Sequence, residues 1–166
     1  MGRKIAKHTR LFLRGNAWEY LPNQEELEKV EGLILDLTQS TEKQINSQMF
    51  ERLPKLRLLE IRDVHGIKGH FKNSFHELRC IYWRYCTWTQ LPSSFRPQKL
   101  ISIVMPFSNF EILWDDSRHF TTLKIINVER SKLKSVDSKK SFLQVMVVRK
   151  HFLPFYEVET LKYIMW

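Results

Sequence analysis

Four six-residue phrases recur at a nearly constant interval in the middle of the chain, and this recurrence constrains the fold more than any other feature. Each phrase has Leu at its first position, Leu or Ile at its fourth and an apolar residue at its sixth. The starts are separated by 22, 22 and 23 residues. One such hexapeptide is common by chance, whereas four in register are not. The phrases are Leu56–Ile61, Leu78–Trp83, Leu100–Met105 and Leu123–Val128.

A period in the twenties with this phrase is typical of the leucine-rich repeat. Each phrase predicts a short strand whose apolar side chains share one side. A single coil cannot bury that side, but stacked coils build a continuous core. We therefore predict an α/β leucine-rich-repeat solenoid, a short horseshoe with parallel strands on its concave face and irregular or short helical segments on its convex face. An ordinary half-buried sheet would explain each strand but not the spacing.

Weaker copies of the phrase flank the four strong ones, at Val30–Leu35, Leu143–Val148 and Leu161–Trp166. The Asn or Cys that usually follows the strand and bonds the loop backbone is mostly absent, and only Cys86 fits it. We therefore expect irregular coils. The predicted organisation is a basic segment at 1–29, repeats at 30–135 with strands near 33–37, 58–62, 80–84, 101–105 and 124–128, and divergent repeats at 136–166.

Two helices are expected between the strands. Asn23 can cap a short helix, and Glu26 follows it at the spacing of a capping box. A second helix is predicted from Thr41 to about Leu53, where Pro54 would end it. Its apolar positions recur at helical spacing and are interpreted as core: Ile45, Met49, Phe50 and Leu53.

The formal net charge of the chain is +9, and its basic residues gather near both ends. Such a surface attracts polyanions or acidic proteins, although a solvated rim is the favoured interpretation. No nucleic-acid motif accompanies the charge, so nucleic acid is an unlikely partner. The chain has two cysteines and no secretory signal, which indicates a reduced cytoplasmic or nuclear protein. It has no apolar run long enough to cross a bilayer, so we expect no membrane partner.

No catalytic motif of the kinds that position a nucleophile, a metal or a redox pair occurs in the sequence. His65, His70 and His76 lie in one loop region, but they lack the Cys or carboxylate spacing of a metal site. We therefore expect neither an enzyme, nor a cofactor, nor a bound metal.

The outward strand positions of a solenoid are the ones free to contact a partner. Tyr82, flanked by Arg62 and Arg84, is the best hot-spot candidate, because Tyr and Arg are enriched at such anchors. Lateral stacking within the sheet explains these residues about equally well. The predicted partner-binding residues of the concave face are Leu58, Glu60, Arg62, Tyr82, Arg84, Ser102, Val104, Ile125, Asn127 and Glu129.

Several longer phrases resemble the start of the leucine-rich-repeat region in plant intracellular immune receptors of the TIR–NB-ARC–LRR class. The resemblance covers about residues 1–135, and its phrases are specific in combination. It departs from the family between residues 8 and 27, and 136–166 match nothing recognisable. The matching phrases are Met1–Ile5, Glu28–Leu37, Phe50–Leu59, Leu78–Trp83, Leu91–Leu100 and Met105–Trp114.

This resemblance implies that residues 1–29 are the remnant of a winged-helix subdomain, and that the chain is a truncated receptor or a fragment. It implies a role in pathogen recognition and autoinhibition, with NB-ARC or TIR domains, a pathogen effector or a host guarded protein as partner. The family's Gly-Lys-Ser/Thr phosphate loop is absent from the sequence. A polyanion-binding domain and a non-functional remnant stay open as alternatives.

Overall fold

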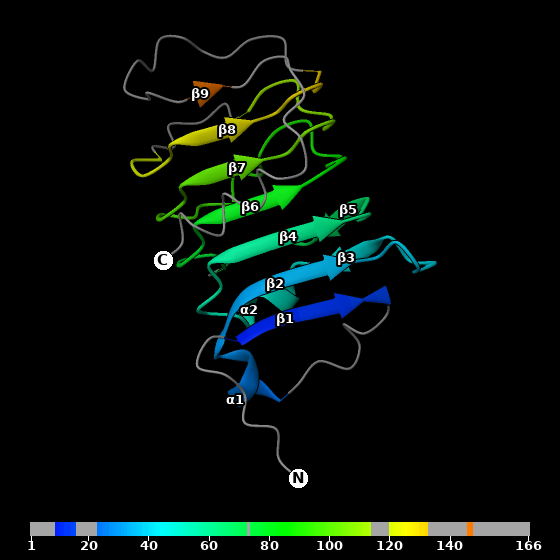
Figure 1. Cartoon of the computed structure of the whole chain (residues 1–166), viewed down its shortest axis with the longest axis vertical. Helices are drawn as coiled ribbons and strands as arrows, with labels where there is room; N and C mark the ends of the chain where they lie inside the picture. The colour runs from blue at the N-terminus through cyan, green and yellow to red at the C-terminus, as the bar shows by residue number, and fades with distance from the viewer. Residues whose placement is uncertain (1–8, 16–22, 73, 114–119, 133–145, 148–166) are drawn as a thin grey trace.

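A computed structural model describes residues 9–15, 23–72, 74–113, 120–132 and 146–147. The weak repeat copy at Leu161–Trp166 lies outside the described residues. Seven of the strands form one sheet, in which every neighbouring pair is parallel and the spatial order follows the chain. Figure 1 shows them stacked one above the next, with all arrows pointing the same way. They are β1 (Thr9–Arg14), β2 (Val30–Asp36), β4 (Leu58–Arg62), β6 (Cys80–Trp83), β7 (Ser102–Val104), β8 (Ile125–Asn127) and β9 (Met146–Val147).

The register of this sheet puts one apolar residue of each coil directly beside its counterpart in the next. The row consists of Leu33, Leu59, Ile81, Ile103 and Ile126, and all five side chains are buried. A fully buried side chain of this size stabilises the fold by about 1.5–3 kcal/mol relative to an exposed one. The predicted solenoid is therefore confirmed, and its strands lie within about three residues of the positions predicted between 33 and 128.

The return side of the coils is built from aromatic rings rather than from leucines alone. Phe50, Phe71, Phe75 and Phe95 form a connected cluster, with ring centroids 5.0 to 6.2 Å apart. Trp88 contacts Phe71 edge-on at 5.6 Å. All four phenylalanines are buried. Large rings fill the space between return segments that have little regular backbone, which fits the expectation of irregular coils.

The sheet begins upstream of residue 30, where the repeats were predicted to start. β1 pairs with β2 in parallel from Arg10 to Arg14. Its Leu13 is buried, whereas Arg10 and Phe12 are exposed, so the strand alternates like the others. The assignment of 1–29 to an earlier subdomain did not foresee this strand, because the basic residues hid a short apolar alternation.

The first predicted helix is confirmed and the second is wrong in extent. α1 (Gln24–Leu27) is capped by Asn23, whose side chain accepts a hydrogen bond from the Glu26 backbone at 3.0 Å. The stretch 41–53 instead forms β3 (Gln44–Asn46) and a single turn, α2 (Gln48–Glu51). β3 pairs in parallel with β5 (Gly66–Lys68) of the next coil. Pairing between coils supplies these backbone groups with hydrogen bonds and so overrides the helical spacing of the apolar residues.

A left-handed backbone turn follows most strands of the large sheet. Asp63, Tyr85, Phe107 and Arg130 have φ angles of 53°, 60°, 56° and 54° and repeat at the period of the coils. Such angles are rare for bulky residues and cost about 1–2 kcal/mol each. Hydrogen bonds between coils offset this strain: the Tyr85 amide donates to the Pro106 carbonyl at 3.1 Å, and the Phe107 amide to the Glu129 carbonyl at 2.7 Å. We call these four residues the left-handed column.

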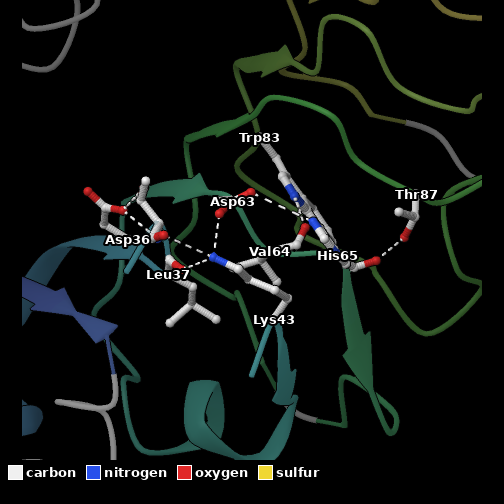
Figure 2. A network of polar contacts seen from close by, with 9 residues as sticks. Asp36, Leu37, Lys43, Asp63, Val64, His65, Trp83 and Thr87 are labelled. Carbon is white, nitrogen blue, oxygen red and sulfur yellow. Dashed lines mark hydrogen bonds and ion pairs between the residues drawn. The ribbon is translucent and has the colours of Figure 1, made fainter. Parts of the chain in front are cut away.

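Other side chains donate hydrogen bonds to loop carbonyls here, in place of the Asn side chain that usually follows each strand of a leucine-rich repeat. The Trp83 indole donates to the Val64 carbonyl at 3.1 Å, and the Thr87 hydroxyl donates to the His65 carbonyl. Lys43 donates to the Leu37 carbonyl and to the Asp63 carboxylate, and so joins two successive coils. Figure 2 shows these contacts gathered at one side of the strands. The loop positions where Asn is usual are buried here as Val64, Cys86 and Ser108.

Truncating Ile103 to Ala should lower the free energy of unfolding by about 2–5 kcal/mol, because Ile103 is fully buried in the middle of the apolar row. Ile112→Ala is the matched control, since 45% of the Ile112 side chain is exposed. The control should change stability by less than about 0.5 kcal/mol. Urea unfolding monitored by circular dichroism measures both values, and equal losses would contradict the solenoid core.

Candidate interaction surface

The register confirms that the outward strand positions share one face of the large sheet. Leu58 lies beside Cys80, then Ser102, then Ile125, while Glu60 lies beside Tyr82, then Val104, then Asn127. We call this surface the open face, consisting of these two rows with Arg62, Arg84 and Glu129 at their carboxyl ends. All ten predicted site residues therefore lie on or at the edge of one surface, as the sequence analysis expected of their placement.

Arg62 is held by carboxylates of the same face. Its guanidinium lies 2.6 Å from Glu60 Oε1 and 4.0 Å from Asp36 Oδ2. Asp36 is buried, and its Oδ1 accepts hydrogen bonds from the backbone and hydroxyl of Thr38. The Thr38 hydroxyl, its backbone amide and the Arg62 charge together hold the pKa of Asp36 below its usual value. Arg62 is thus a neutralised, structural cation.

Tyr82 lies at the centre of the open face and is half-buried. Burial raises the pKa of its hydroxyl, against the opposing charge of Arg84. Burial likewise raises the pKa of the neighbouring Cys80 thiol to about 11. Both groups therefore remain protonated near neutral pH. The face offers a neutral phenol, which suits packing and hydrogen bonding, while the Cys80 thiol is buried beside it.

Two of the predicted contact residues are placed on the open face but have little surface to offer. Ser102 is 1% exposed and Asn127 is 9% exposed. The Ser102 hydroxyl is buried without a hydrogen-bond partner, whereas Asn127 Oδ1 accepts from the Glu129 amide at 3.0 Å. The half-buried Leu58, Tyr82, Val104 and Ile125 are the side chains better placed to contact a partner.

Arg84 contacts aromatic rings, unlike Arg62, and these neighbours were not predicted from the sequence. Its guanidinium carbon lies 4.9 Å from the ring centroid of Tyr85 and 4.8 Å from that of Phe107. The Arg130 guanidinium carbon also lies over the Phe107 ring, 5.2 Å from its centroid. The available signal was an aromatic residue in the same place of two successive repeats, 22 residues apart.

Within the described ranges, no three His, Cys, Asp or Glu side chains gather closely enough to hold a metal ion. In the same part of the chain, no helix combines the length and the apolar character needed to cross a bilayer. Cys80 and Cys86 are both buried free thiols, and burial raises the pKa of Cys86 to about 12.

Several curated proteins with similar sequences are named for disease resistance. Disease resistance protein LAZ5 of Arabidopsis thaliana is 26% identical over 145 residues, which cover 76% of this chain and 12% of the relative. Disease resistance-like protein DSC1 of the same plant is 26% identical over 141 residues, which cover 78% of this chain and 12% of DSC1. Disease resistance protein RRS1, also of Arabidopsis thaliana, is 31% identical over 113 residues, which cover 63% of this chain and 8% of RRS1.

The chain is a relative of plant TIR–NB–LRR disease resistance proteins. This confirms the resemblance inferred from the sequence phrases. The aligned part spans about a tenth of the length of these relatives. No family model matches the chain. No solved structure matches it either.

Replacing Asp36 by Asn should destabilise the protein at neutral pH and remove part of its acid sensitivity. A lowered pKa in the folded state contributes stability that is present above the unfolded pKa and is lost as the pH falls through the folded one. The stability difference between the wild type and Asp36→Asn should therefore shrink below the usual Asp value of 3.8. Unfolding free energies measured from pH 2.5 to pH 6 test this, and a difference independent of pH would contradict it.

Proposed function

We propose that this chain is a non-catalytic leucine-rich-repeat module of a plant innate-immune receptor, serving pathogen recognition and autoinhibition by binding protein. The observation that carries the proposal is the open face, a continuous parallel sheet with half-buried apolar and aromatic side chains in register. The kinship with disease resistance proteins supports the immune setting. The expected partners are an NB-ARC or TIR domain, a pathogen effector or a host guarded protein.

Protein is a better partner than a polyanion because many cations of the described residues are already paired. Arg57 lies 3.4 Å from a Glu31 carboxylate oxygen, and Lys99 lies 2.6 Å from one of Glu77. Arg62 is paired with Glu60 as described above. A polyanion site needs cations that can exchange their counterions for phosphates or sulfates, and its binding falls steeply with salt. Cations that are already paired with carboxylates release fewer counterions, so they add less affinity for a polyanion.

The cytoplasm is the compartment that we propose for this module, with the nucleus as the alternative. Both compartments keep thiols reduced, and two buried free cysteines fit such surroundings.

The test is a pull-down of the chain co-expressed with a TIR–NB-ARC segment of a disease resistance protein. Tyr82→Ala combined with Val104→Ala removes two half-buried side chains that lie side by side on neighbouring strands. We expect a complex that survives moderate salt and that the double variant weakens at least tenfold, as for a central hot spot of about 1.4 kcal/mol or more.

Ile112→Ala, outside the open face, is the control and should bind like the wild type. A folded double variant with unchanged binding would exclude this part of the open face. A complex that dissolves as salt rises would support the polyanion alternative instead, and an aggregated chain without a complex would support the remnant.

A further inference from the structure

An aromatic and arginine cluster lies at the rim of the open face, where the chain leaves the strands. It consists of Arg84, Tyr85, Phe107 and Arg130, and we call it the rim cluster. The Tyr85 and Phe107 rings are 5.4 Å apart between centroids, and the Arg84 guanidinium lies within 5 Å of both. Tyr85 is 54% exposed, the most of any large hydrophobic residue described. The rings hold the guanidinium in place without burying themselves in the core.

The backbone does not require aromatic residues at these positions. Tyr85 and Phe107 belong to the left-handed column, where the φ angle favours glycine. β1 ends at the equivalent place with Gly15, whose φ is 58° and where an added Cβ would meet no atom within 4 Å. An exposed Tyr85 and a half-buried Phe107 therefore occupy strained positions whose backbone a glycine adopts more easily. The contacts of the two rings with each other and with Arg84 offset part of this strain, and they leave Tyr85 exposed to a partner.

Within the rim cluster, Arg84 is less neutralised than Arg62. Among the residues that the structure describes, no carboxylate lies within ion-pair distance of Arg84, and its Nε is buried without a hydrogen-bond partner. Arg130 brings a second guanidinium, 3.8 Å from the carboxylate of Glu129. Arginine presents a rigid fork of donors that matches a carboxylate, and stacking on rings fixes the orientation of that fork.

We propose that the rim cluster binds an acidic peptide segment, containing aromatic residues, of a protein partner. The Arg84 guanidinium pairs with a carboxylate of that segment, and the exposed Tyr85 ring, packed on Phe107, takes an aromatic side chain. Fixed rings and a fixed guanidinium reduce the entropy lost on binding. This inference rests on the proposed role as a protein-binding module, and it names the chemistry of the segment and the residues that recognise it.

Fluorescence anisotropy with a fluorescein-labelled dodecapeptide of repeated Glu-Glu-Trp units tests the proposal on the full chain. The Tyr85→Gly, Phe107→Gly double variant should raise the Kd at least tenfold while still unfolding cooperatively in urea, because the relief of left-handed strain by glycine opposes the loss of the ring contacts. Arg84→Gln should weaken binding at least fivefold. The same peptide with Gln in place of Glu should bind at least tenfold more weakly to the wild type.

Phe12→Ala is the matched control, because Phe12 is 48% exposed and also lies near an arginine, with Arg14 at 5.5 Å from its ring centroid. It should leave the Kd unchanged. Absence of peptide binding, equal binding by a folded rim variant, or an equal loss with Phe12→Ala would overturn the proposal. Labelled heparin that loses as much affinity as the peptide in the rim variants would also overturn it, since the rim would then be a general anion site.

The two proposals can fail separately. If the TIR–NB-ARC complex forms and depends on Tyr82 and Val104 while the rim variants bind the acidic peptide normally, only the rim proposal fails. If the peptide depends on the rim cluster while no complex forms, only the receptor-module proposal fails.

Discussion

The structure depends on the contact of each apolar strand residue with its counterpart one coil away. A row such as Leu33, Leu59 and Ile81 has no partner layer of its own, and it becomes a core only because the next coil repeats it in register. Each buried member contributes about 1.5–3 kcal/mol. That contribution supports features that are costly alone, including the left-handed column and the unpaired Ser102 hydroxyl. Stability is therefore shared between neighbours rather than concentrated in one place.

The same repetition explains why the large sheet could be predicted from the sequence. A strand buried on one side needs apolar residues at fixed spacing, so the spacing of Leu59, Ile81 and Ile103 predicts their strands. The return segments obey a weaker rule. Ile45 and Met49 suit a helix by spacing, yet pairing between β3 and β5 satisfies the backbone better. β1 was missed because its outward positions carry Arg10, Phe12 and Arg14, which look like a basic tail rather than a strand.

The candidate surface was predictable in position but not in chemistry. Alternation along each strand places Glu60 and Tyr82 on one face, and the register pairs these two residues. Side-chain partners depend on distances that the sequence does not contain. Arg62 is neutralised by Glu60, and Ser102 is buried, whereas Arg84 stacks on two rings from different coils. The left-handed turns that present those rings follow from hydrogen bonds between coils, not from the residues that occupy them.

Hydrogen–deuterium exchange of the native chain, resolved by residue, tests the stacked parallel coils most directly. Successive amides of a central parallel strand donate alternately to its two neighbouring strands, and neighbouring coils open together. The account predicts slow exchange in β2, β4, β6 and β7, recurring at the repeat period, with faster exchange in the return segments between them. Exchange of Leu59, Ile81 and Ile103 amides at the rate of an unstructured peptide would contradict the solenoid and the surface built on it.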